Sequence, residues 1–293
     1  MKNLLHNIQI LMMLALMVVG IQSCSDDLQE TGDVEVSFTA TLPTDTRTRS
    51  FGKAEQVNTL VVGIFKKGVS DEHTNSGGSW SYYETDRKFF PISGTSIDVS
   101  LSLAQNQTYS FVFWAYDSSQ NIYDIDDLTA VKMNTLPNPI TFSEAEASDA
   151  FFATEKDITV TGSSSYPIEL VRPLAQINVG TTGVPMQASF TAKSAPDTFH
   201  PFANTVSGET DFIWNFSDTT TETFSADGTA YNYLAMGYLF APTTAMQIAA
   251  ELTLTDGEKS KTVEFPKVEI EANQRSNIAG GFTRSEERRV GKE

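Results

Sequence analysis

One stretch decides the fold class of this chain, residues 33–43, which reads DVEVSFTATLP. Apolar side chains occupy every second position and polar side chains lie between them, which is the period of a β-strand with one buried face. We therefore predict a half-buried strand here. Its inward residues are Val34, Val36, Phe38, Ala40 and Leu42.

Similar segments recur along the rest of the chain. Residues 97–103 and 246–254 alternate in the same way, whereas residues 60–65, 109–116 and 231–241 are apolar on both faces, as in strands inside a sandwich. Residues 143–147 favour about one helical turn. We predict an all-β fold of two tandem Greek-key β-sandwich domains, residues 33–163 and 164–283, divided where the sequence is small and polar.

The residues before the first strand have the layout of an exported protein. Residues 1–23 combine an early lysine, an apolar run and a polar end, which predicts a secretory signal peptide. A membrane-spanning helix would need about 20 apolar residues, more than this run supplies. Residues 21–24, IQSC, resemble a bacterial lipobox, in which the cysteine is lipidated and becomes the first residue after cleavage.

The lipobox interpretation predicts a membrane anchor. Cys24 is the only cysteine, so lipid attached to it would hold the protein at the outer membrane, and internal disulfides are excluded. Residues 24–32 would form an acidic tether. Its first residues after the cysteine, Ser25, Asp26 and Asp27, resemble the signal that sends lipoproteins of the Bacteroidetes to the cell surface. The alternative is a plain signal peptide with an incidental cysteine.

Composition excludes some partners. The formal net charge of −17 argues against nucleic acid, because a basic surface is needed to attract phosphates. Residues 284–293, RSEERRVGKE, differ in composition from the acidic chain before them and resemble a translated sequencing adapter. We set them apart as a foreign tail; the alternative is a charged, solvated terminus.

Residues suited to catalysis are few. Only His73 and His200 follow the leader, and no zinc-ligand spacing or phosphate-binding glycine motif is present, so we predict no enzyme activity, no metal and no cofactor. Acidic residues between Asp117 and Asp127 could hold calcium, but surface acidity explains them better. The aromatic residues Trp80, Tyr82 and Tyr83 are typical of either a sugar-stacking platform or cross-strand packing.

Several segments together resemble the fimbrillin-like lipoproteins of the Bacteroidales. Besides the lipobox and the first strand, they are YSFVFWA (109–115), RPLAQINV (172–179), YLAMGY (233–238) and NQRSNI (273–278). The resemblance covers residues 24–282 and implies two transthyretin-like sandwiches in a pilus subunit at the cell surface. Its implied partners are outer-membrane lipid through Cys24, other fimbrial subunits, and a host or bacterial surface ligand.

The resemblance also implies how such a subunit assembles. Fimbrillins of this kind lose their first strand to an arginine-specific protease and accept a strand from a neighbour. The matching residues here are Arg47 and Arg49, directly after the strand over residues 33–43. Burial of its apolar residues contributes on the order of 8 kcal/mol, so the emptied groove would capture a matching strand. The alternative interpretations are two solvated arginines and, for the whole protein, a surface glycan-binding lipoprotein.

Overall fold

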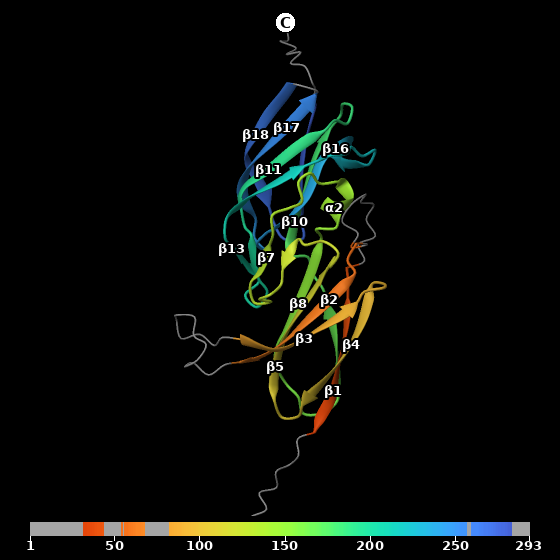
Figure 1. The fold of residues 1–293 in the computed structure, drawn as a ribbon, viewed down its shortest axis with the longest axis vertical. Helices are drawn as coiled ribbons and strands as arrows, with labels where there is room; N and C mark the ends of the chain where they lie inside the picture. The colour runs from red at the N-terminus through yellow and green to blue at the C-terminus, as the bar shows by residue number, and fades with distance from the viewer. Residues whose placement is uncertain (1–31, 44–53, 55, 68–81, 257–258, 283–293) are drawn as a thin grey trace, which may run out of the picture.

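The structure is a computed structural model that describes residues 32–43, 54, 56–67, 82–256 and 259–282. It consists of two β-sandwich lobes that follow one another along the long axis (Figure 1). The predicted all-β fold of two tandem sandwiches is therefore confirmed. Within the described ranges, no helix is long and apolar enough to span a membrane.

The N-terminal lobe packs two sheets against each other. Their strand orders are β4-β1-β9 and β3-β2-β5-β8. The core between them is formed by apolar side chains from both sheets, among them Val99 from the first and Phe111 and Phe113 from the second. The strands are β1 (Asp33–Thr41), β2 (Thr59–Lys67), β3 (Tyr82–Pro91), β4 (Ser96–Ala104), β5 (Thr108–Tyr116), β8 (Ala150–Thr159) and β9 (Ser164–Glu169).

The C-terminal lobe also has two sheets, with orders β15-β16-β10-β19 and β14-β11-β17-β18. Strands β16 and β17 come from two of the segments that the apolar pattern predicts. The strands of this lobe are β10 (Leu174–Thr181), β11 (Ala188–Ala195), β14 (Thr210–Asn215), β15 (Thr223–Ala226), β16 (Thr229–Phe240), β17 (Met246–Asp256), β18 (Lys259–Ile270) and β19 (Arg275–Gly280).

The two lobes share one connectivity, which no sequence repeat reveals. In each, the first strand pairs antiparallel with a later strand and parallel with the last one: β1 with β4 and β9, and β10 with β16 and β19. Strand β9 is therefore the closing strand of the N-terminal lobe. The predicted domain division before residue 164 instead assigns β9 to the C-terminal domain; the sheets divide after Glu169.

A third, small sheet and a shared core join the lobes. The small sheet has the order β13-β12-β7-β6, so it combines segments from both halves of the chain. Phe152 on β8 meets Phe199 on β12 with ring centroids 4.5 Å apart, and Trp114 on β5 meets Phe240 on β16 at 6.2 Å. The remaining elements are β6 (Tyr123–Asp124), β7 (Val131–Met133), β12 (Thr198–His200), β13 (Thr205–Ser207) and the helix α2 (Phe142–Glu146).

Local sequence signals explain how several elements begin and end. Thr141 and Glu144 form a reciprocal capping box at the start of α2, the helical turn expected around residues 143–147. Asp227 and Gly228, both with positive φ, form the two-residue turn of the β15–β16 hairpin. Pro266 lies in β18, an edge strand, where its missing N–H breaks no ladder.

The shared core predicts cooperative unfolding. Because side chains from both lobes belong to one apolar cluster, we expect a single thermal transition in which the calorimetric enthalpy equals the van't Hoff enthalpy. Differential scanning calorimetry of residues 33–282 measures both quantities. Two resolved transitions would contradict a shared core and indicate independently folding lobes.

Candidate functional site

The candidate site is the position that β1 occupies between β4 and β9, called here the β1 slot. Asp33–Thr41 pair antiparallel with Ala104–Ser96 on one side, and Val36–Thr41 pair parallel with Ser164–Glu169 on the other. Strands β4 and β9 form the two edges of this three-stranded sheet, and within the described chain β1 is the strand that joins them. Loss of β1 would therefore leave both neighbours without a ladder.

The side chains of β1 face as the sequence predicts. Val36, Phe38 and Ala40 are fully buried, Leu42 is almost fully buried, and Val34 is partly buried against the same core. The inward set thus provides one continuous apolar strip along the slot.

Phe38 lies at the centre of an aromatic cluster. Its ring centroid is 4.9 Å from that of Phe111, 5.2 Å from Phe113 and 5.5 Å from Tyr166. These three rings, called here the aromatic socket, come from β5 and β9. Because such ring pairs add to the stabilisation from buried area, Phe38 is the strongest single contact of β1.

The outer face of β1 is polar and open to solvent. Thr39 Oγ1 donates a hydrogen bond to Asp98 Oδ1 at 2.9 Å, and the Ser100 hydroxyl donates to Glu35 Oε1 at 2.8 Å. Exposed hydrogen bonds of this kind contribute little net stability, so the inward side chains dominate the affinity of the slot for its strand.

The other sequence-predicted site residues lie outside the described residues. These are the lipidation residue Cys24, the export signal Ser25, Asp26 and Asp27, and the processing residues Arg47 and Arg49. The described chain places the two segments that hold them at opposite ends of β1. Gly32 precedes the strand, and Leu42 and Pro43 follow it.

A buried ion pair lies where the N-terminal lobe passes into the C-terminal lobe. Arg172 donates through Nε to Asp149 Oδ1 and through Nη2 to Oδ2, both at 2.7 Å. Its guanidinium lies 4.8 Å from the centroid of the Phe151 ring and 5.9 Å from that of Tyr238. Nη1 also donates to Asn273 Oδ1 at 3.4 Å, in the turn before β19. One cation thus joins both lobes.

Burial and charge act in opposite directions on this pair. Burial raises the pKa of the Asp149 carboxyl, against the opposing charge and hydrogen bonds of Arg172. Burial alone would lower the pKa of Arg172, but the Asp149 carboxylate outweighs it and raises that pKa. The sequence contained no signal for the pair, because its members are 23 positions apart.

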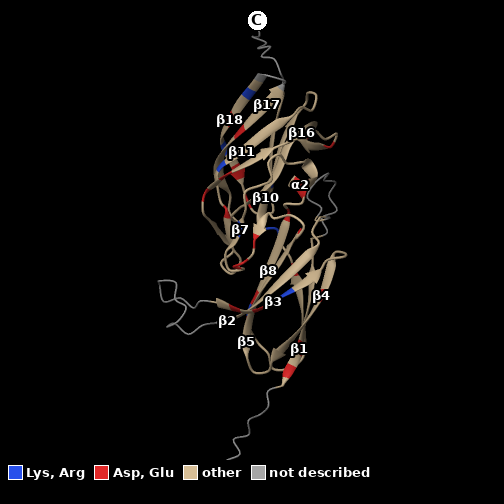
Figure 2. Ribbon diagram, viewed as in Figure 1, with Lys and Arg blue, Asp and Glu red and all other residues tan. Residues whose placement is uncertain are grey.

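Carboxylates in the acidic segment between Asp117 and Asp127 accept hydrogen bonds from nearby protein groups. Asp117 Oδ1 accepts from the backbone N–H of Ser119 at 2.9 Å, and Asp127 Oδ1 accepts from that of Thr129 at 2.8 Å. Arg87 donates to the carbonyl oxygens of residues 125 and 126 at 2.6 and 3.1 Å. Among the described residues no His, Cys, Asp and Glu side chains gather as a metal site. Figure 2 shows acidic residues spread over both lobes.

The aromatic residues considered for sugar stacking are divided by the structure. Tyr82 packs on Phe202, with centroids 4.2 Å apart and planes at 21°, so one ring face is covered by the other lobe. Tyr83 is 37% exposed, and Trp80 and His73 lie outside the described residues. The stacking on Phe202 therefore makes Tyr82 part of the packing between the lobes. His200, the histidine that the structure describes, shares a hydrogen bond of 2.7 Å between its Nε2 and the Ser207 hydroxyl.

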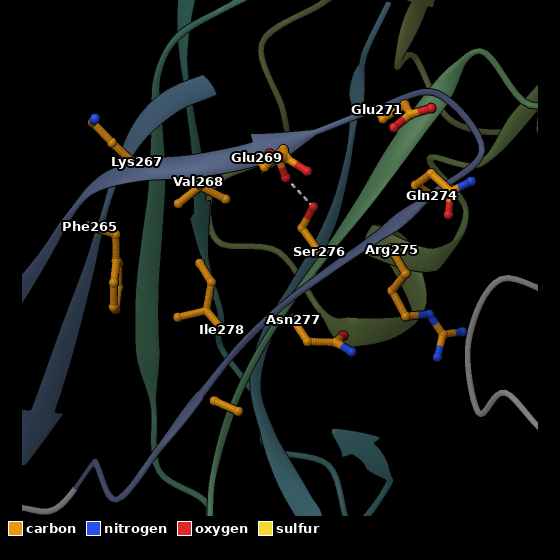
Figure 3. Close-up of a pocket in the computed structure, with 11 residues that line it drawn as sticks. Phe265, Lys267, Val268, Glu269, Glu271, Gln274, Arg275, Ser276, Asn277 and Ile278 are labelled. Carbon is orange, nitrogen blue, oxygen red and sulfur yellow. Dashed lines mark hydrogen bonds between the residues drawn. The ribbon is translucent and has the colours of Figure 1, made fainter. Parts of the chain in front are cut away.

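A groove that the sequence did not predict lies between β18 and β19 (Figure 3). Its volume is about 680 Å³, and the Ser276 hydroxyl, which donates to the carbonyl oxygen of Glu269, bridges it. Charged side chains such as Lys267 and Glu271 line it beside the apolar Phe265 and Ile278. Both strands are sheet edges with polar composition, so periodicity alone could not have predicted a groove here.

Comparison with solved structures found remote similarities. A candidate adhesin from Bacteroides thetaiotaomicron has 14% identity over 82% of each chain and a TM-score of 0.48. A fimbrial assembly protein from Parabacteroides distasonis has 11% identity over 84% of this chain and 90% of its own, with a TM-score of 0.45. The fimbrial anchor protein Mfa2 from Porphyromonas gingivalis has 12% identity over 80% of this chain and 82% of its own, with a TM-score of 0.42.

Sequence comparison assigns the chain to a family. No curated protein matches it. The profile of a family of unknown function (DUF6562) matches residues 28–291, a range that includes most of the segment 284–293 set apart above as foreign. Since this match spans most of its length, the chain belongs to the family of unknown function DUF6562.

Proposed function

We propose that this protein is a surface-exposed, lipid-anchored fimbrial subunit or fimbria-associated adhesin that assembles by strand replacement in the β1 slot. One observation carries the proposal. A strand whose inward residues Val36, Phe38 and Ala40 are fully buried is the sole link between β4 and β9 in the described chain, yet it lies at the N-terminal end of its lobe. A single cut after it would separate it from the rest of the protein.

The C-terminal lobe provides an internal contrast. Strand β10 holds the equivalent position, between β16 and β19, but the chain continues from both of its ends into described strands, β9 before it and β11 after it. A cut on one side of β10 would leave it attached on the other. Of the two equivalent strands, β1 is therefore the one suited to exchange.

The order of residues around β1 would join processing to release from the membrane. The predicted anchor, Cys24, precedes β1, and Arg47 and Arg49 follow it. A cut at either arginine would leave β1 on the lipidated fragment and free the remainder, whose emptied slot presents apolar side chains and unpaired backbone groups. Such an edge is a template for an extended segment of another subunit.

The direction of the strands favours end-to-end assembly. Thr41, at the end of β1, accepts a hydrogen bond from Leu170 at the lobe junction, so β1 begins at the far end of the N-terminal lobe. Strand β10 begins at Leu174, just after that junction, and β19 runs parallel to it, away from the N-terminal lobe. Contacts made between opposite ends of identical subunits are heterologous and propagate into filaments.

The proposed partners are outer-membrane lipid, other fimbrial subunits and a host or bacterial surface ligand.

Proteolysis followed by strand exchange tests this proposal. We expect an arginine-specific protease to cut the native chain after Arg47 or Arg49, and the cut chain to incorporate a fluorescent peptide of residues 33–43. Mass spectrometry locates the cut, and fluorescence-detected gel filtration measures incorporation. The control is the double variant Arg47→Gln/Arg49→Gln, in which residues 33–43 should stay joined to the rest of the chain and exclude the peptide. A cut, folded chain that never takes up the peptide would refute strand replacement.

A further inference from the structure

We infer that the aromatic socket selects the incoming strand: the partner segment must place an aromatic side chain where Phe38 lies, and this contact sets its register. The inference rests on the proposed function and deepens it. The partner it specifies is an extended segment of another subunit, with alternating apolar residues, one aromatic ring among them and a small residue two positions later.

Alternation alone cannot set the register of a strand in this slot. A shift by one residue would turn the apolar side chains to solvent, but a shift by two keeps them inward. The inward residues of β1 are otherwise aliphatic, so a two-residue shift is prevented only if one position differs from its neighbours. Phe38 is the one aromatic residue of β1.

The walls of the slot differ at that position. Phe38 lies opposite Val99 on β4 and Tyr166 on β9, and it contacts the three rings of the aromatic socket. The adjacent inward positions have aliphatic or small partners. Val36 lies opposite Leu101 and Ser164, and Ala40 lies opposite Ile97 and Ile168.

A two-residue shift would therefore be penalised at two places. It would leave the aromatic socket filled by a valine or an alanine, which creates a cavity, and it would press the phenyl ring into a site that now holds a smaller side chain. Strand β10 contains no aromatic residue although it holds the equivalent position in the other lobe. The aromatic requirement is therefore a property of the β1 slot and does not follow from the shared connectivity.

Peptide exchange into the slot tests the inference. In a full-length variant, residues 44–49 are replaced by the recognition site of a sequence-specific protease. Cutting this variant with that protease makes the test independent of natural processing at Arg47 or Arg49. Labelled peptides of residues 33–43 then compete for the slot in mild urea. We expect the Phe38→Ala peptide to bind at least about 100-fold more weakly than the unmodified peptide, as truncation of a buried phenylalanine implies. The matched control is the outward substitution Thr41→Ala, expected within about threefold.

A fourth peptide tests register directly. It carries Phe38→Ala together with Ala40→Phe, so that its composition is conserved while its ring is moved by two positions. We expect it to bind at least about 100-fold more weakly, or to bind with its residues shifted by two relative to Ser96–Ala104, as disulfide trapping against cysteines placed in β4 would show.

The outcomes separate the two proposals. Binding of the Phe38→Ala peptide within threefold of the unmodified one, or unshifted binding of the moved-ring peptide at full affinity, would overturn the aromatic requirement and leave strand replacement intact. Failure of the unmodified peptide to enter the slot would overturn strand replacement, and the inference with it.

Discussion

Replacing Phe38 with alanine in the uncut protein should lower the free energy of unfolding by about 3–5 kcal/mol. The side chain is fully buried, and its ring lies 4.9 to 5.5 Å from three other rings, so truncation removes apolar burial and leaves a cavity between two sheets. Urea denaturation followed by tryptophan fluorescence measures the change. Such a loss is a large part of the stability of an ordinary domain.

The matched control is Thr41→Ala, on the exposed face of the same strand. It changes strand propensity without opening a cavity, so we expect a loss below about 1 kcal/mol. Similar losses in the two variants would mean that the aromatic socket does not hold β1 in place, and the energetic basis of strand replacement would fail.

Replacing Asp149 with alanine should cost a comparable 3–5 kcal/mol, through a different cause. Arg172 has only 8% of its side-chain surface exposed and would lose both hydrogen bonds that it donates to the Asp149 carboxylate, so a cation would remain buried between the lobes. Because these contacts join both lobes, we expect the two lobes of the variant to unfold together, at a lower denaturant concentration than the unmodified protein. Denaturation monitored by circular dichroism gives the difference.

An exposed ion pair on the same protein serves as the control. Asp86 lies 2.8 Å from Lys88 with half of each side chain exposed, and Asp86→Ala should cost less than about 1 kcal/mol. In a double-mutant cycle, Asp149→Ala combined with Arg172→Met should cost less than the sum of the single changes, because no buried charge then remains unpaired. An additive cycle would show that the two residues act independently.

The sequence predicted individual strands better than their partners. The strict alternation of residues 33–43 indicated both the strand and its buried face, because period-two burial is a local property. The residues of β9, SSYPIE, carry no such pattern, and their pairing with β1 connects residues more than 120 positions apart. Only tertiary structure reveals that β9 closes the first lobe, which is why the predicted division falls before it.

In the candidate site, too, the local pattern was predictable from the sequence and the long-range contacts were not. Phe38 and its inward neighbours could be identified from the sequence, whereas the socket of Phe111, Phe113 and Tyr166 depends on how two sheets face each other. The run RPLAQINV contains Arg172, but the pairing of Arg172 with Asp149 depends on how the chain folds at the lobe junction. The single-cysteine anchor and the two arginines after β1 are chemical predictions that lie outside the described residues.

Hydrogen–deuterium exchange of the backbone provides the most direct test of the account. In the cut chain, displacement of β1 should remove the protection of amides in β4 and β9 while β2 and β5 stay protected, and addition of the peptide of residues 33–43 should restore it. Unchanged protection of β4 and β9 after β1 has been removed would contradict the claim that β1 holds them together as a replaceable strand.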